Sequence, residues 1–402
     1  MKKGNVLVIG NSGVGKSTLI NAVFGRDVAR TGYGSKGTTK WVLAYEDEGV
    51  PFRLVDTVGF EPTWLKEREA AAAIRKWVKE KEDGEERQIH AIWYCVDGTS
   101  RKLFPKTIES LFRATAVWKS VPVIAVITKS YSVPDRIENI AMVREVFDSK
   151  EKYARNLKGI VPVVAKAYVL NDEAFAPPEG IDELVELTAA LLPEGIRAGE
   201  RDAASWQLAR KSYLAHGVVA AATVSGVAVG AAPIPGGVTD AAILSTLELA
   251  MVNSIARVYG IKKSEASKRF ANSIVEVGTV SQAARAAVAA LKAIPGIGVS
   301  AMVINAVVAG CIVAALGEGS IYAFEQVALG NRSFDDLDWL QKLLESKLTA
   351  NFVEKAKGVL AQSGGKADKQ GLAQLILALF LPASEEKAAE KADGGKAAPG
   401  GR

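Results

Sequence analysis

The residues with the clearest chemical meaning lie near the start of the chain, in the stretch GNSGVGKST at positions 10–18. It fits the pattern G-x-x-x-x-G-K-[ST], with Gly10, Gly15, Lys16 and Ser17 at the fixed positions. Glycines let the backbone curl so that successive N–H groups point inward at phosphate oxygens. A lysine in this place reaches the β- and γ-phosphates, and the serine hydroxyl binds Mg2+. The pattern therefore predicts a loop that binds a nucleoside triphosphate together with magnesium.

Such a loop must connect a strand to a helix, because the helix N-terminus adds its positive dipole end to the phosphate site. The apolar run NVLVIG predicts the strand over residues 5–10, and TLINAVFG predicts the helix over residues 18–25. The two elements fall where the chemistry needs them, which favours a phosphate loop over a glycine-rich turn that matches by chance. The residues expected to bind the nucleotide here are Asn11, Ser12, Gly13, Val14, Gly15, Lys16, Ser17 and Thr18.

Polar residues further along the chain stand in the order that a triphosphate and its metal require. GTTK offers Thr38 and Thr39, and LVDTVGFE places Asp56 at a strand end with Gly59 three residues later. In phosphoryl-transfer enzymes a carboxylate at this strand end holds Mg2+, and a nearby glycine N–H contacts the γ-phosphate. A plainer interpretation of the two threonines is that they are capping residues or ordinary polar residues of a loop.

With these motifs, residues 4–195 resemble a Ras-superfold GTPase of the Era-like type, and they are also similar to immunity-related GTPases. The resemblance implies binding of GTP and GDP and hydrolysis of GTP with Mg2+. It assigns the Mg2+-binding threonine to Thr39, with Thr38 as the next candidate. Together with Ser17 and Asp56, Thr39 would hold the metal, and Lys16 and Thr39 would be the catalytic residues.

One position departs from the Ras pattern. Phe60 follows DTVG at the place where Ras-like proteins carry the glutamine that positions the attacking water. A phenyl ring cannot hydrogen-bond to water, so intrinsic hydrolysis is expected to be slow or to use another group. Era-like GTPases commonly have a hydrophobic residue there.

The segment that would read the base departs further. The family pattern is Asn/Thr-Lys-x-Asp, and the sequence has TKSY, so Thr128 and Lys129 match while Tyr131 replaces the aspartate. That carboxylate accepts hydrogen bonds from guanine N1–H and the exocyclic amine, and Tyr131 cannot replace this pair of acceptors. Ser130 and Asp135 are the other polar residues of the loop that could approach the base edge.

VVAKAYVL supplies the last family signature as Ala165 and Lys166, where a backbone N–H would contact the guanine carbonyl. GTP is the expected nucleotide, mainly from the family resemblance. Relaxed base specificity, and with it an ATP-binding module, stays open as an alternative.

Six short β-rich runs alternate with helical patterns up to about residue 195, which is typical of an open α/β sheet. The runs are NVLVIG, WVLAYED, FRLVD, HAIWYCVDG, VPVIAVITK and GIVPVVAKA, and the turn residues EDEGVP join the second to the third as a hairpin. A mostly parallel six-stranded sheet between helices is therefore expected.

The composition changes after the stretch LLPEGIRAGERDAA at residues 191–204. No residue carries a full charge from Ser212 to Thr239 or from Ala293 to Gly317, and Ala, Gly and Val dominate both stretches. The segment ILSTLELAMVNSIARVYG places Leu244, Leu247, Met251, Ile255 and Val258 at helical spacing, which predicts a core stripe. The second half is expected to be all-α and rich in Ala and Gly. On this helix Asp240 and Glu248 are interpreted as a cap or a buried pair.

Residues 210–325 resemble the YcjF-like helical domain that follows Era-like GTPase domains in bacteria, on the motif PIPGG, Asp240 and a closing Tyr-Gly. The resemblance implies membrane association. Both uncharged stretches are long enough to span a bilayer, but Ala, Gly, Ser and Thr contribute little to partitioning. Small residues also favour close helix packing in water, so a membrane-associated domain and a water-soluble bundle both stay open.

The sequence thus predicts a GTPase domain over residues 1–198, a helical domain over 199–381 and a disordered tail over 382–402. A net charge of +5 on 402 residues gives no electrostatic reason to expect nucleic acid as a partner. Cys95 and Cys311 lie in apolar segments, which fits a reducing, cytoplasmic compartment, at the inner face of the cell membrane if the helical domain binds lipid.

The hypothesis is a slow GTPase that acts as a nucleotide-controlled switch on the helical domain, with guanine nucleotide, a membrane surface and a second copy as expected partners. The alternative is a membrane-inserting or pore-like protein whose assembly is gated by nucleotide.

Overall fold

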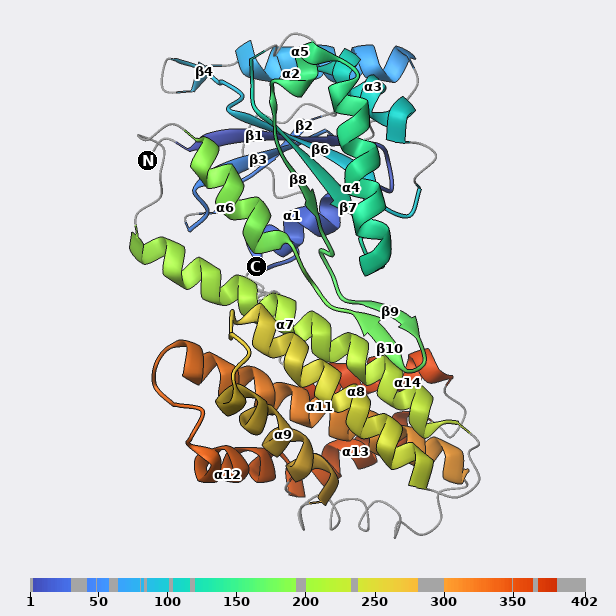
Figure 1. Ribbon diagram of the computed structural model, residues 1–402. Coiled ribbons are helices and arrows are strands. Elements are labelled where there is room, and N and C mark those ends of the chain that lie inside the picture. Colours follow the sequence, from blue (N-terminus) through green and yellow to red (C-terminus); the bar gives the residue numbers. More distant parts are fainter. Residues whose placement is uncertain are drawn as a thin grey trace, which may run out of the picture. The chain divides into compact units, whose positions relative to one another are not determined.

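The computed structural model divides into two compact units, Met1–Tyr168 with Ala176–Leu214, and Val169–Phe175 with Ala215–Arg402 (Figure 1). The division falls within helix α7 (Glu200–Gly230). The domain boundary expected between residues 198 and 199 stays a prediction. The structure describes residues 3–29, 42–47, 49–57, 64–79, 81–82, 85–100, 104–115, 120–192, 200–232, 238–280, 300–348, 350–363 and 368–381.

The first unit is built on a six-stranded sheet in the order β2-β3-β1-β6-β7-β8. Strand β2 is antiparallel to β3, and the other pairs are parallel, which confirms the predicted sheet and its hairpin. Strands β1, β6 and β7 are almost continuously apolar because both faces of the sheet are covered. The strands are β1 (Gly4–Gly10), β2 (Val42–Tyr45), β3 (Phe52–Thr57), β6 (Ala91–Asp97), β7 (Val123–Thr128) and β8 (Leu157–Pro162).

Helices cover both faces of this sheet, and neighbouring residues of β6 show the alternation. Tyr94 faces a core that contains Phe112 and Phe147, whereas the Trp93 indole N–H points to the other face and donates to the Thr188 hydroxyl at 3.0 Å. Helices α2, α3 and α4 supply the first face, and α1 and α6 lie on the second (Figure 1). The helices are α1 (Lys16–Phe24), α2 (Trp64–Lys79), α3 (Phe104–Ala114), α4 (Val133–Asp148), α5 (Glu151–Ala154) and α6 (Ile181–Leu191).

The structure contains two short hairpins that the sequence did not predict. Two short hairpins, β4 (Lys81–Glu82) with β5 (Glu85–Glu86) and β9 (Tyr168–Asn171) with β10 (Ala174–Ala176), stand apart from the main sheet. Helix α4 begins at Val133 because the Ser132 side chain caps it and a proline fits its first turn.

The second unit is helical in its described part after α7, as predicted for the second half of the chain. The described helices of this unit after α7 are α8 (Val238–Val258), α9 (Glu265–Val280), α11 (Ala301–Ala328), α12 (Leu337–Lys347), α13 (Ala350–Ser363) and α14 (Lys369–Phe380). Helix α11 lies at the centre of this unit, because it contacts α8, α9, α12, α13 and α14.

Glycines allow the C-terminal part of α7 to pack closely on α11. A Cβ atom on Gly230 would lie 2.6 Å from the Asn305 carbonyl oxygen and 2.9 Å from the Ala306 Cα, so no larger residue fits there. A Cβ on Gly226 would lie 2.9 Å from the Val313 side chain. The Ala/Gly-rich composition therefore serves close contact between helix backbones.

Four residues of the stripe predicted on α8 belong to the core, since Leu247, Met251, Ile255 and Val258 are buried, whereas Leu244 is half-buried. Glu248 lies on the same helix with 0% exposure, and neither carboxylate oxygen has a hydrogen-bond partner among the described residues. The side chain of Asp240 lies outside the described part of the structure, so the interpretation of these two residues as a cap or a buried pair stays a prediction. Burial raises the pKa of Glu248 to about 8, since a charged carboxylate loses its hydration there.

We expect Glu248→Gln to stabilise the protein at pH 8 and to flatten the dependence of its stability on pH. The Glu248 carboxyl stays protonated in the folded chain up to about pH 8 but ionises near its ordinary value of 4.5 when unfolded. Folding stability is therefore lost as the pH rises between these values, by an amount on the order of a few kcal/mol.

The measurement is chemical denaturation at pH 5 and pH 8, with the exposed Glu276→Gln on α9 as the matched control. Equal slopes with pH for Glu248→Gln and the natural protein would contradict the assignment.

Candidate nucleotide-binding site

The phosphate loop follows β1 and leads directly into α1. Gly13 and Gly15 have φ angles of 76° and 101°, which are strained for any residue with a side chain, so the loop needs glycine at both positions. Gly15 is the N-cap of α1, and no side chain caps the helix there. The first N–H groups of α1 are therefore left as donors for an anion.

Lys16 and Asp56 come together because β1 and β3 are neighbouring parallel strands, with Val8 opposite Asp56. The Lys16 ammonium is buried and donates to the Gly10 and Asn11 carbonyls at 2.8 and 3.2 Å. Asp56 is buried too, and burial raises its pKa to about 6, while the Lys16 charge acts in the opposite direction. The loop thus holds its lysine at the place where phosphate would replace the two carbonyls as partners.

A cavity of about 400 Å3 opens between this loop, β2 and the end of β3. It brings together predicted residues of the phosphate loop and Asp56 with residues that sequence reasoning missed. Leu43 and Tyr45 line it because Leu43 pairs with Asp56 across the β2–β3 ladder, which places their side chains on one face. In the sequence, only the register of the predicted β2–β3 hairpin could have indicated that Leu43 and Tyr45 line the cavity. The lining residues are Ser12, Gly13, Gly15, Lys16, Ser17, Thr18, Ala29, Leu43, Tyr45, Asp56 and Thr57.

The cavity has the chemistry of a magnesium–phosphate site. Asp56 Oδ1 is buried and has no hydrogen-bond partner among the described residues, which leaves an oxygen suited to a hard cation or its water. The Ser17 hydroxyl lines the same cavity. The described residues contain no cluster of three His, Cys, Asp or Glu side chains, so within this part of the chain Asp56 and the Ser17 hydroxyl are the side chains suited to Mg2+.

The predicted base-reading loop is tied to the phosphate loop by Thr128. Its hydroxyl lies 2.6 Å from the Val14 carbonyl and 3.0 Å from the Val96 carbonyl. Lys129 has a φ of 53° and forms an ion pair of 2.6 Å with Asp97 at the end of the neighbouring strand. This pair holds the pKa of Asp97 below its usual range.

Tyr131, at the family aspartate position, stacks on Tyr168 with ring centroids 4.2 Å apart and an interplanar angle of 12°. Ser130 is 3% exposed, and its hydroxyl donates to the Ile127 carbonyl, so this side chain anchors the loop. Ala165 is half-buried and Lys166 is exposed in the loop after β8.

These base-loop residues and Asn11 and Val14 do not line the cavity, and Asp135 lies in the first turn of α4. Four predicted positions, Thr38, Thr39, Gly59 and Phe60, lie outside the described residues. Their assigned roles stay predictions.

We expect Thr128→Val to weaken nucleotide binding by about 2- to 10-fold, because it removes a hydrogen bond that fixes the phosphate loop against the sheet. Titration with a fluorescent GTP analogue measures the affinity. Thr188→Val is the matched control: it also removes a buried hydroxyl of this unit, on α6. An equal loss of affinity in both variants would assign the effect to general destabilisation.

Comparison with known proteins agrees with this geometry. Residues 5–129 match the family described as a 50S ribosome-binding GTPase. GTPase Era from Geobacter metallireducens is 26% identical over 197 residues, which are 48% of this chain and 57% of that protein. Cell division control protein 10 of Saccharomyces cerevisiae is 28% identical over 182 residues, covering 38% of this chain and 55% of that protein. The chain thus spans little more than half the length of these relatives.

Among solved structures, Era in complex with MgGDPNP and 16S ribosomal RNA nucleotides is similar with a TM-score of 0.34 and 23% identity. The match covers 56% of this chain and 68% of that one. The phosphate loop, the sheet that carries it and the family match over residues 5–129 lead to one conclusion: the N-terminal part of this chain is a P-loop GTPase domain, related to Era and other GTPases.

Proposed function

We propose that the chain hydrolyses GTP to GDP and phosphate, slowly, and that the bound nucleotide controls the helical unit. The observation that carries the proposal is the cavity of about 400 Å3 in which Lys16, Ser17 and the unpartnered Asp56 oxygen meet. An uncapped helix N-terminus and a buried ammonium suit the β- and γ-phosphates, and a carboxylate oxygen suits their metal.

In this mechanism the chain acts mainly by positioning and by charge. Water attacks the γ-phosphorus, the bond to the β–γ bridging oxygen breaks, and GDP leaves with the electron pair. Lys16 and the N–H groups of residues 13–18 stabilise the charge that develops on the phosphate oxygens. Ser17, Thr39 and Asp56 would hold Mg2+. When bound, this ion would supply positive charge beside the β- and γ-phosphates. Slow turnover is expected because the position after DTVG is Phe60.

GTP is proposed as the nucleotide from the family match, and the base loop limits how strongly guanine would be selected. Tyr131 is held by Tyr168 and the Ser130 hydroxyl is already used, so neither offers the two acceptors that guanine requires. We therefore expect a smaller preference for GTP over ATP than the family aspartate would give.

The first test measures phosphate release from GTP by the purified chain with Mg2+, and competition of ATP against GTP for binding. Lys16→Ala should lower turnover about 100-fold or more, because it removes a charge from the transition state. Lys106→Ala, an exposed lysine on α3, is the control and should leave turnover unchanged. Absence of saturable GTP binding and of turnover, with and without vesicles, would refute the proposal.

A membrane-inserting or pore-like protein gated by nucleotide is the second candidate. The observation that favours it is that two helices, α7 over Trp206–Gly230 and α11, are long and apolar enough to cross a membrane. In each helix, 67% of the most apolar segment of 18 residues is buried inside the structure. These residues therefore already have protein neighbours. We propose a cytoplasmic protein whose helical unit meets the inner face of the membrane; self-association stays part of this proposal.

Flotation with lipid vesicles and dye leakage separate the two candidates. A switch should leave vesicles intact, whereas a pore should release dye. If Lys16→Ala, in which hydrolysis is strongly lowered, still causes leakage equal to that of the natural protein, the pore is favoured. Flotation without leakage supports a switch at the membrane surface, and no flotation contradicts both membrane roles.

A further inference from the structure

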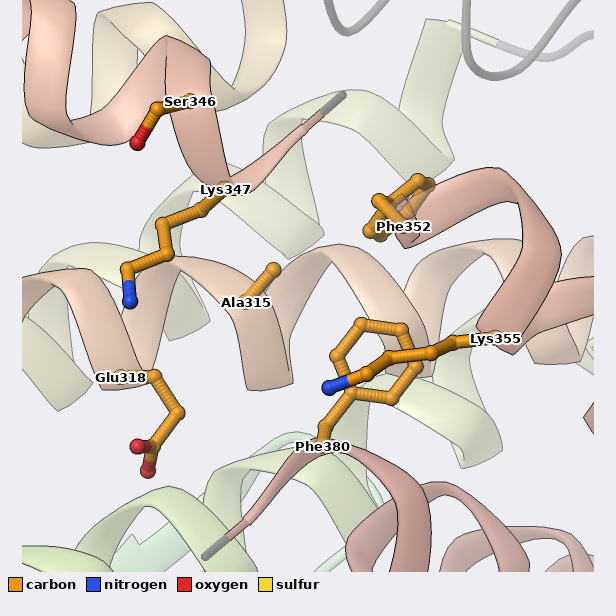
Figure 2. Close-up of a pocket in the computed structure, with 7 residues that line it drawn as sticks. All are labelled: Ala315, Glu318, Ser346, Lys347, Phe352, Lys355 and Phe380. Atoms are coloured by element: carbon orange, nitrogen blue, oxygen red, sulfur yellow. The ribbon is translucent and has the colours of Figure 1, made fainter. Parts of the chain in front are cut away.

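A second cavity, of about 280 Å3, lies entirely within the helical unit (Figure 2). It is formed where the end of α12, the start of α13 and the end of α14 meet the middle of α11. The lining residues are Ala315, Glu318, Ser346, Lys347, Phe352, Lys355 and Phe380. Nothing in the nucleotide reaction uses these residues.

Two lysines of different helices line this cavity: Lys347, which is exposed, and Lys355, which is half-buried and extends along the Phe380 ring (Figure 2). No carboxylate of the described residues lies within ion-pair distance of either. By contrast, Lys357 on α13 pairs with Glu354 at 2.8 Å. The cavity therefore presents two positive charges without direct ionic partners.

Aromatic rings form the apolar part of the cavity. Phe352 is 1% exposed and Phe380 is 9% exposed, and their rings pack edge to face with centroids 5.6 Å apart. The Lys355 ammonium lies 5.1 Å from the Phe380 ring centroid, a cation–π contact that holds it over the ring. A ligand here would meet charge and apolar surface side by side.

Glu318 places one carboxylate in the same cavity. Its Oε1 lies 3.3 Å from His216 Nε2 on α7, and its side chain remains 19% exposed. The carboxylate can accept a hydrogen bond from a hydroxyl or ammonium group of a ligand. It also opposes a simple anion, but with two lysines the cavity keeps a positive balance.

From this arrangement we infer that the cavity binds a phosphate ester that carries a hydroxyl or ammonium group and a short apolar chain. Lysines on separate helices can each offer a point charge to an oxygen of a tetrahedral phosphate. Glu318 accepts from the hydroxyl or ammonium group, and the two rings contact the chain. Such an ester is found in a phospholipid headgroup and in small soluble metabolites.

The experiment compares two double variants of the full chain. Lys347→Ala/Lys355→Ala removes the charges of the cavity, and Lys342→Ala/Lys357→Ala removes two lysines outside it on the same two helices. The soluble probe is sn-glycerol 3-phosphate, measured by calorimetry, and the lipid probe is a phosphatidylglycerol vesicle, measured by flotation against phosphatidylcholine.

We expect the cavity variant to weaken binding by about tenfold or more, and the control variant to bind as the natural chain does. Binding of the soluble probe identifies a metabolite site, and binding of vesicles alone identifies a lipid site. If the natural chain binds neither probe, or if both double variants lose binding equally, the proposal is overturned.

Glu318→Gln tests the hydrogen bond that Glu318 would accept from the ligand's hydroxyl or ammonium group. This test does not depend on whether the double variants fold. The natural chain should prefer sn-glycerol 3-phosphate to propyl phosphate, which lacks the hydroxyl groups. The variant should lose most of this preference, since a neutral amide accepts more weakly than a carboxylate. An unchanged preference would remove Glu318 from the site.

Discussion

The candidate nucleotide site depends on the register of four parallel strands, β1, β3, β6 and β7. Because β1 lies between β3 and β6, the phosphate loop that leaves β1 emerges between Asp56 and the ends of β6 and β7. Both faces of these strands are buried, so close packing of side chains on each face holds this register. Thr128 then fixes the loop itself through the Val14 carbonyl.

Burial also sets the electrostatic character of this site. A carboxylate with 5% exposure and one unpartnered oxygen costs free energy in the protein alone, and a bound cation would offset that cost. The Lys16 ammonium is meanwhile held by two carbonyls that phosphate oxygens can replace. The site is thus built to exchange internal contacts for contacts with a charged ligand.

The helical unit follows a different physical rule. Helix α11 is surrounded by other helices, and glycines such as Gly230 allow backbones to come within contact distance, so packing depends on small residues and not on large apolar ones. This tight interior nevertheless holds Glu248 without a partner, while the cavity beside Phe380 holds two lysines without direct ionic partners. The buried Glu248 carboxyl therefore carries a stability cost at high pH, whereas the two lysines at the cavity are accessible to a ligand.

The sequence by itself determined the phosphate loop, the succession of strands and helices along the chain, and the helical nature of the second half. These follow from local patterns: glycine spacing at Gly10 and Gly15, alternating runs of strand and helix, and the apolar stripe around Met251. Only the tertiary structure decided that Leu43 and Tyr45 line the nucleotide cavity, that Tyr131 stacks on Tyr168, and that Lys347 and Lys355 line one cavity. The reason is that these contacts join residues across strand pairing or helix packing, and no local pattern in the chain encodes such a distance.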